Sequence, residues 1–456
     1  MIFGSEVVTR RSALRALAGA SIGKFLPHGS DSPPKASPSV GSDPQHEVAV
    51  DNNLTLAPWT PGTLDLHHIS TGRGNVTYIV CPDGTTLLVD AGALNSAPGW
   101  SSDEKYRIAP KPNSSRRPGE WIARYIQRHM PPGRSPGIDC FLLTHFHADH
   151  MGAIDLLPHT PVFSKFGQYE LTGVMDVHEA VPIHRIVDRA WPDYNYPVPL
   201  EDPHQQNYRS FLKDFVRNGG TVERFIPGVD NQIKLVTALA GEYRNCTVRN
   251  LAANGRVWTG AGDGATETFP RLSSLKKEDY PSENKCSLAL LLSYGAFRYF
   301  SAGDMGHETA YGRLPWGDIE SRVASVAGPV DVAIANHHGY ANACGPDWVR
   351  SLQAKAYVIS AWDSAHPTIP SMDNMLSKEL YTSARDVYST ALKAENVIAT
   401  KRLRELQSQN GHIVVRVAPT GGSFHIFVTT NADESDAVLA MRGPYGSGFG
   451  SSDGHH

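Results

Sequence analysis

A histidine-rich segment that follows an apolar run constrains the fold and chemistry of this chain more than any other feature. It reads Thr144-His145-Phe146-His147-Ala148-Asp149-His150-Met151-Gly152. Alternation along an extended segment points His145 and His147 to the same side, and the turn that follows brings Asp149 and His150 back toward them. Imidazole and carboxylate are ligands that zinc and related cations take. A lone histidine is more often a structural hydrogen-bonding residue, but this HxHxDH pattern predicts a site for two adjacent metal ions.

Short apolar runs bounded by turn residues alternate with a few helical patterns. They predict strands at Leu64–Ile69, Val76–Cys81, Thr85–Asp90, Ile138–Thr144, Thr221–Ile226, Gln232–Leu239, Ser287–Ser293, Phe297–Ser301, Val330–Asn336, Ala356–Ser360, His412–Ala418 and Ser423–Thr429. Apolar spacing predicts a helix over Gly119–Met130, and Met151–Leu157 can start another. Strands outnumber helices and alternate with them in the middle of the chain, which favours a mixed α/β (α+β) fold.

Composition divides the chain into a leader, a body and a tail. We expect the body, 60–430, to form one domain, with the aromatic- and proline-rich segment 158–282 as an elaborated insertion that walls a site. The Gly/Ser-rich segment 431–456 predicts a flexible tail. In residues 1–45, paired arginines precede a short apolar stretch and a Pro/Ser-rich run, which resembles a twin-arginine export signal. The alternative is a disordered or amphipathic basic leader. An export signal implies a periplasmic or extracellular protein.

Further motifs, in a fixed order from about residue 62 to 430, carry a family resemblance. They are His67-His68-Ile69-Ser70-Thr71-Gly72-Arg73-Gly74-Asn75, Cys81-Pro82-Asp83-Gly84, Val89-Asp90-Ala91-Gly92, Glu283-Asn284-Lys285-Cys286-Ser287, Phe300-Ser301-Ala302-Gly303-Asp304, Asn336-His337-His338-Gly339 and Ala365-His366-Pro367. Together with HxHxDH they resemble the metallo-β-lactamase superfamily, and in particular the ComEC-like nuclease domain of competence proteins and its free-standing exported relatives. The resemblance implies a four-layer αββα sandwich with a dinuclear metal site at one edge.

The resemblance also implies metal ligands, residue by residue. His145 and His147 would bind the first metal, and Asp149 and His150 would bind the second. Asp304 would bridge both, because the two oxygens of one carboxylate can hold two cations.

The remaining positions around the metals are less uniform. The last ligand of the second metal would be His337 or His338; His337 is favoured because it follows its apolar run more directly, although spacing leaves His338 open. Asp90 would orient a ligand imidazole or the bridging water, or would only cap its turn. Asn284 stands where most of the superfamily has a histidine. Because an amide oxygen is a weaker zinc ligand than imidazole, the first site would be weaker, water-filled or better suited to manganese.

Other residues have expected roles near the site. His366 is predicted to contact the leaving oxygen, as a catalytic residue beside Asp149 and Asp304, while Tyr340 and Asn342 could line the pocket. Further candidates are His178, His184 and His204 as substitute ligands, Gly72-Arg73-Gly74 as a phosphate-binding turn, and Cys286 as a buried residue.

The composition of the chain limits the classes of partner that we expect it to bind. Lys+Arg 42 against Asp+Glu 46 gives a formal net charge of −4. There is no basic excess, so we expect no tight nucleic-acid binding. The body contains no run of about 18 apolar residues, so no membrane span is expected. The five scattered cysteines indicate neither a disulfide framework nor a thiol nucleophile, although the pairing of Cys81 stays open.

These inferences define one leading function and two alternatives. We expect an exported hydrolase that uses a hydroxide shared by two divalent cations, zinc or else manganese. The ComEC-like resemblance points to a phosphodiester or phosphate ester, and the acidic balance makes a small molecule at least as suitable as a polymer. The first alternative is hydrolysis of a carbonyl substrate such as a lactone, thioester or β-lactam. The second is a binding protein with a vestigial site.

Overall fold

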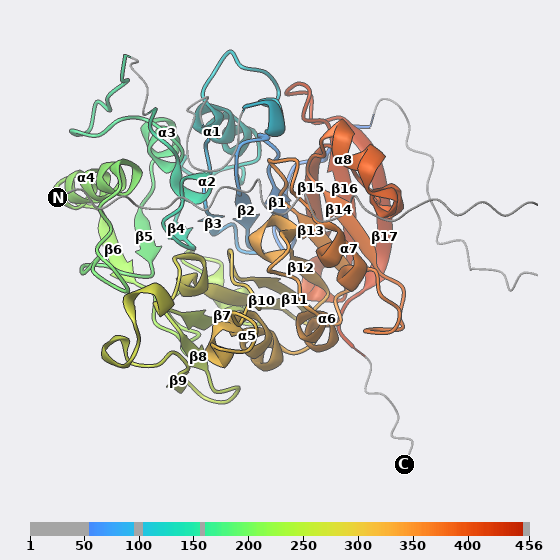
Figure 1. The fold of residues 1–456 in the computed structure, drawn as a ribbon. Coiled ribbons are helices and arrows are strands. Elements are labelled where there is room, and N and C mark those ends of the chain that lie inside the picture. The colour runs from blue at the N-terminus through green and yellow to red at the C-terminus, as the bar shows by residue number, and fades with distance from the viewer. Residues whose placement is uncertain (1–53, 95–103, 156–159, 450–456) are drawn as a thin grey trace, which may run out of the picture. The chain divides into compact units, whose positions relative to one another are not determined.

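Nine strands form the first of two large β-sheets in the computed structural model, which describes residues 54–94, 104–155 and 160–449. They are β1 (Leu64–His68), β2 (Thr77–Val80), β3 (Thr86–Val89), β4 (Cys140–Leu143), β5 (Arg185–Asp188), β6 (Thr221–Arg224), β15 (His412–Val417), β16 (Ser423–Thr429) and β17 (Val438–Gly446). Their order across the sheet is β17-β16-β15-β1-β2-β3-β4-β5-β6. Of the three C-terminal strands, β15 therefore pairs with β1, the first strand of the body, and β16 and β17 extend the sheet beyond it (Figure 1).

The second sheet is built from the middle of the chain. Its eight strands are β7 (Cys246–Ala253), β8 (Arg256–Trp258), β9 (Ala265–Glu267), β10 (Ala289–Tyr294), β11 (Phe297–Ser301), β12 (Val332–Ile334), β13 (Ala356–Ile359) and β14 (Asp386–Ser389). They lie in the order β14-β13-β12-β11-β10-β7-β8-β9. Both sheets are mixed, because each combines antiparallel hairpins with a run of parallel strands.

The parallel runs decide where a site can form. In the first sheet β3, β4, β5 and β6 are parallel, and in the second β11, β12, β13 and β14 are parallel. Parallel strands end at the same edge of a sheet, so the loops that follow them gather there. The histidine-rich segment follows β4, and Asp304 and the double histidine follow β11 and β12. The sheet topology thus brings distant motifs to corresponding sheet edges.

Helices cover the sheets and bury their apolar stripes. They are α1 (Pro118–Arg128), α2 (Ala148–Met151), α3 (Val174–Ala180), α4 (Pro203–Arg217), α5 (Ile319–Ala327), α6 (Pro346–Leu352), α7 (Ile369–Met375) and α8 (Ala394–Ala399). One apolar cluster joins α1, α3 and α4 to the first sheet, another joins α5, α6 and α7 to the second, and a third contains residues of both sheets. Figure 1 shows α1 and α3 on one side of the sheets and α5 on the other. The described residues thus have a mixed α/β fold with two large mixed sheets.

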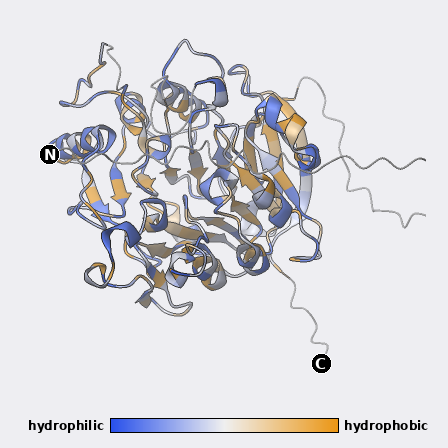
Figure 2. Cartoon of the chain, in the orientation of Figure 1, coloured by the Kyte–Doolittle hydropathy of each residue, from blue (hydrophilic) through white to orange (hydrophobic). Residues whose placement is uncertain are grey.

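The helix α4 illustrates why the sequence folds locally as it does. Asp202 caps its first turn by accepting a hydrogen bond from Gln205 N at 2.9 Å, and Pro203 occupies the first helical position. Tyr208 and Phe211 recur at helical spacing and are fully buried. Leu212 and Phe215 are buried on the same face, and most other residues of the helix are polar, as its largely blue colour shows in Figure 2.

Several sequence-based expectations differ from the structure. No strand forms over Gln232–Leu239. The sequence predicts that a helix can begin at Met151, but Met151 is instead the last residue of α2 (Ala148–Met151). The segment 158–282, expected as an elaborated insertion of one domain, supplies β5 and β6 to the first sheet and β7, β8 and β9 to the second. The tail expected from residue 431 contains β17, which pairs with β16.

Other expectations concern the chain ends, the cysteines and membrane spans. The expected leader, 1–45, lies outside the described residues, so export stays a prediction. All five cysteines are buried free thiols; Cys286 lies in a short 3-10 turn before β10, and the Cys81 thiol lies beside that of Cys246. Among the described residues, no helix combines the length and apolarity needed to cross a bilayer.

Candidate metal centre

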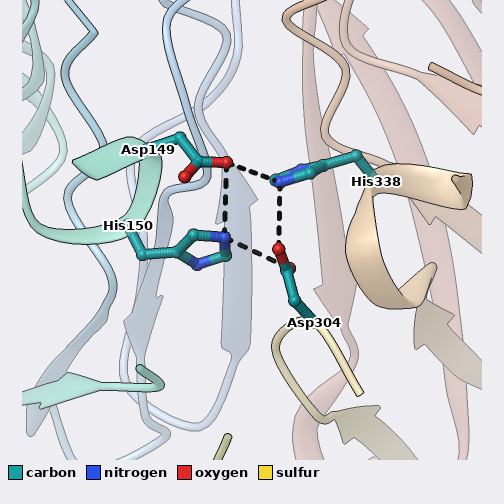
Figure 3. A group of neighbouring side chains, drawn as sticks. All are labelled: Asp149, His150, Asp304 and His338. Atoms are coloured by element: carbon teal, nitrogen blue, oxygen red, sulfur yellow. Dashed lines mark hydrogen bonds and ion pairs between the residues drawn. The ribbon is translucent and has the colours of Figure 1, made fainter. Parts of the chain in front are cut away.

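Four buried side chains, two from a segment that follows the first sheet and two from segments that follow the second, converge where the parallel strands end. Asp149 and His150 lie on α2, just after β4, and face Asp304 and His338, which follow β11 and β12 (Figure 3). Asp149 Oδ2 is 3.0 Å from His338 Nε2, and His150 Nε2 is 3.2 Å from Asp304 Oδ1. His150 Nε2 to Asp149 Oδ2 and His338 Nε2 to Asp304 Oδ2 are both 3.7 Å. The ligand atoms lie within 4.8 Å of one another, so this group could hold a metal ion.

A second group shares one member with the first. His145, His147 and Asp304 also offer ligand atoms within 4.8 Å of one another. His145 Nε2 is 3.1 Å from His147 Nδ1 and 3.7 Å from Asp304 Oδ2. Asp304 therefore belongs to both groups, as a carboxylate that holds two cations would.

Asp90 fixes the orientation of a ligand-group imidazole. It is fully buried after β3 and accepts a hydrogen bond from His150 Nδ1 at 2.7 Å. The Thr144 hydroxyl and Asn75 Nδ2 donate to the same oxygen, both at 2.9 Å. A neutral His150 whose Nδ1–H donates to Asp90 has its lone pair on Nε2, which faces Asp304. Asp90 therefore lies behind the two His/Asp groups.

The double histidine separates into two different positions, and the group of Asp149 contains His338 rather than His337, which the sequence favoured there. Both residues have left-handed backbone angles, with φ of 47° at His337 and 54° at His338. His338 completes the group of Asp149, and its Nδ1 donates to the Ser360 carbonyl at 2.8 Å. His337 instead lies 19% exposed, with Nε2 3.7 Å from Asp304 Oδ2. Two consecutive left-handed residues place both imidazoles near Asp304, so distance from the preceding strand could not decide between them.

Asn284 lies beside His337. Its Nδ2 is 3.3 Å from His337 Nε2, while Asn342 Oδ1 accepts from His337 Nδ1 at 2.7 Å. Asn284 Oδ1 is buried without a hydrogen-bond partner among the described residues, and the same is true of Asp149 Oδ1. Such atoms are costly to bury unsatisfied. Unpartnered carboxylate and amide oxygens in a buried His/Asp cluster fit the donor set of a divalent cation.

The charges of the cluster are strongly coupled. Burial alone would raise the pKa of Asp304, but the imidazoles of His150, His338, His337 and His145 hold it well below its ordinary value. Burial alone would lower the pKa of His150, but the surrounding carboxylates hold it well above its ordinary value. Ionised carboxylates buried together need positive charge beside them. A cation would supply that charge.

A buried ion pair that no sequence pattern indicated braces the histidine-rich segment. Arg189, fully buried after β5, binds Glu283 through two hydrogen bonds. Glu283 Oε1 also accepts from the backbone N–H of Phe146 at 2.8 Å, between His145 and His147 of the second group. The only sequence signal was the position of Glu283 beside Asn284, because the partner lies 94 residues earlier.

The other expected site residues divide into those near the groups and those elsewhere. His366 is buried and stacks on His338 with ring centroids 4.8 Å apart, and burial lowers its pKa well below the ordinary value. Tyr340 lies 5.2 Å from His337, ring to ring. The proposed substitute ligands His178, His184 and His204 belong to neither group. His178 packs among aromatic rings, and the Nδ1 of His204 accepts from the Ile154 backbone.

No protein-family model matches this chain, and no curated protein matches it.

Proposed function

We propose that this chain is a metal-dependent hydrolase with the four-layer αββα arrangement of the metallo-β-lactamase superfamily. Apolar clusters that join helices to each sheet, and one cluster shared by both sheets, support that arrangement. The carrying observation is Asp304, whose carboxylate belongs to both buried His/Asp groups. His145 and His147 would hold a first divalent cation, zinc or manganese, and Asp149, His150 and His338 a second.

When bound, two such cations would supply a water of lowered pKa and positive charge for an oxygen that becomes negative during the reaction. The residues of the chain supply the rest. Asp90 holds His150 in one tautomer, and the Ser360 carbonyl does the same for His338. His366 has a buried Nδ1 without a hydrogen-bond partner among the described residues. As a neutral imidazole it can hydrogen-bond a substrate or leaving oxygen.

We assign a phosphodiester or phosphate ester as the substrate class. The support is the motif set from His67 to His366 and a shared carboxylate suited to two cations, the arrangement that in-line phosphoryl displacement uses. Two features make His337 a further contact for a substrate oxygen. It is partly exposed, and its Nε2 faces Asp304 from outside the fully buried group.

The test combines metal content with turnover. Protein stripped with EDTA is loaded with zinc or with manganese, and hydrolysis of bis(p-nitrophenyl) phosphate is measured beside nitrocefin and a lactone panel. We expect about two cations per chain and phosphodiester turnover. Asp304→Asn should lower both, because it weakens the ligand that the two groups share.

Asp331→Asn is the matched control, since Asp331 is a fully buried carboxylate of the second sheet that pairs with Lys355 away from both groups. It should retain the cations. Hydrolysis of nitrocefin or a lactone without hydrolysis of the phosphodiester would contradict the proposal and indicate a hydrolase of carbonyl substrates. A wild-type chain that retains no cation would support the vestigial site instead.

A further inference from the structure

A buried arginine beside the proposed metal centre has an exposed partner. The Arg73 side chain is 3% exposed, and its guanidinium binds Glu104 through both terminal nitrogens, with Nη1 3.0 Å from Oε2. The Glu104 side chain is 54% exposed. Arg73 Nε is buried without a hydrogen-bond partner among the described residues. A guanidinium this deeply buried is ordinarily held by a partner as buried as itself, because an exposed carboxylate stays hydrated.

The backbone places Arg73 next to the His/Asp groups. Asn75, two residues later, donates its N–H to the Asp149 carbonyl at 2.8 Å and its side chain to Asp90. A Cβ at Gly74 would lie 2.5 Å from the Asp149 carbonyl oxygen, so the turn rests directly on the backbone of α2. Arg73 is therefore anchored to the residues that position the proposed ligands.

A second buried arginine, Arg107, adds positive charge beside the same carboxylate of Glu104. Arg107 is 3% exposed and its Nη1 lies 3.9 Å from Glu104 Oε2. Its segment joins the loop after β13, where Ile108 N donates to the Trp362 carbonyl at 2.9 Å. Burial lowers the pKa of Arg107, and the charge of Asp149 is among those that oppose this effect, so the guanidinium lies within electrostatic reach of the metal-binding groups.

An accessible cleft of about 700 Å³ is lined by both Arg73 and Glu104. Its lining carries further charges of both signs; Arg117 there is bound by the buried carboxylate of Asp176. Arg73 differs from Arg117 because its carboxylate partner is exposed, so Glu104 can move into solvent when an anion replaces it on the guanidinium, whereas the Asp176 carboxylate would stay buried.

We propose that Arg73, with Arg107 beside it, binds a second, non-scissile phosphate group of the substrate, which takes the place of Glu104. This inference rests on the proposed function and deepens it by naming the substrate class, a phosphodiester that carries a further phosphate. The forked guanidinium matches phosphate geometry as it matches the carboxylate. Glu104 offsets one of the two guanidinium charges until the anion arrives.

The first experiment measures binding without turnover. Inorganic phosphate is titrated calorimetrically into EDTA-treated protein, so that the metal centre does not contribute. Arg73→Gln should weaken phosphate binding about tenfold or more, because two charge-assisted hydrogen bonds are lost. Glu104→Gln should strengthen binding, because it removes the competing carboxylate, and a merely structural ion pair would not produce this gain. Arg256→Gln, which breaks an exposed pair with Glu267, should bind like the wild type.

The second experiment uses metal-loaded protein and the dinucleotides TpT and pTpT, which differ by one terminal phosphate. We expect a higher kcat/KM for pTpT, and Arg73→Gln should reduce this preference by about tenfold while Arg256→Gln preserves it. Equal losses on both dinucleotides, or wild-type phosphate affinity in Arg73→Gln, would overturn the proposal. If neither dinucleotide is hydrolysed but the variants change phosphate affinity as expected in calorimetry, the anion site at Arg73 is supported and the proposed phosphodiesterase function is wrong.

Discussion

At the scale of single residues, Asp90 shows how a group outside the ligand set controls it. Its left-handed backbone, with φ of 59°, turns the carboxylate toward His150, Thr144 and Asn75. Asp90→Asn should weaken metal affinity about 10- to 100-fold, because the imidazole of His150 loses its charged carboxylate acceptor and keeps at most a neutral amide oxygen. Competition with a chromophoric chelator measures the affinity.

The matched control for that change is Asp188→Asn, which alters another buried carboxylate that follows the same set of parallel strands. Asp188 accepts hydrogen bonds from Tyr194 and from the backbone, and it belongs to neither His/Asp group. Its variant should keep wild-type metal affinity. Equal weakening in both variants would show that Asp90 acts only through stability.

His338 and His337 make a second test at this scale. His338→Gln should remove one cation per chain, since it takes an imidazole from the group of Asp149. His337→Gln should retain that cation, because His337 lies on the Asn284 side of Asp304. Metal content after gel filtration distinguishes them, and the opposite pattern would restore the sequence-based preference for His337.

The sequence was informative about which residues belong to the site and poor about their partners. The HxHxDH segment and the double histidine can be recognised in the sequence because their candidate ligand residues are close together in the chain. The Glu283–Arg189 pair spans 94 residues and leaves no local pattern. Which of two adjacent histidines joins the Asp149 group depends on backbone angles that spacing does not reveal.

At the scale of elements, β17 is more than an extension of the chain. It pairs with β16, its Tyr445 ring stacks on Phe424 at 4.9 Å, and the Tyr445 hydroxyl donates to Asp386 Oδ2 at 2.5 Å. A chain truncated after Ala437 should unfold at a temperature several degrees lower, because the edge of β16 loses its partner. A chain that lacks only 450–456 should match the full chain, and calorimetry compares the two.

Most strands that carry the site were predicted, since each is a short apolar run followed by turn residues. The failures have local causes. Val438–Gly446 contains two glycines and a proline, so its composition resembles a tail, and only pairing with β16 makes it a strand. Gln232–Leu239 alternates like a strand, but its polar side chains and backbone bond to neighbouring loops instead.

At the scale of the whole molecule, three buried histidines link stability to pH. His67 and His68 on β1 and His412 on β15 are each at most 7% exposed. Burial lowers their pKa values from 6.5 to about 4, about 3 and about 3. The unfolded chain therefore binds protons first as the pH falls, so the folded state is stabilised above pH 6.5 and loses stability below it.

We expect the free energy of unfolding to fall by as much as about 2 kcal/mol per buried histidine between about pH 6.5 and 5. Urea titrations at several pH values measure the slope. His68→Gln should reduce that slope, since one proton-binding group is removed from the difference between the states. An unchanged slope would mean that other groups control acid sensitivity.

The two halves of the candidate ion-binding cluster follow strands of different sheets: Asp149 and His150 follow the first, Asp304 and His338 the second. An ion bound among them would link the two layers, in addition to the apolar packing and the hydrogen bonds that already join them. Removal of the ion by a chelator should then destabilise the contact between the two sheets first. Amide hydrogen exchange should become faster in the segments around the cluster, while distant strands keep their protection.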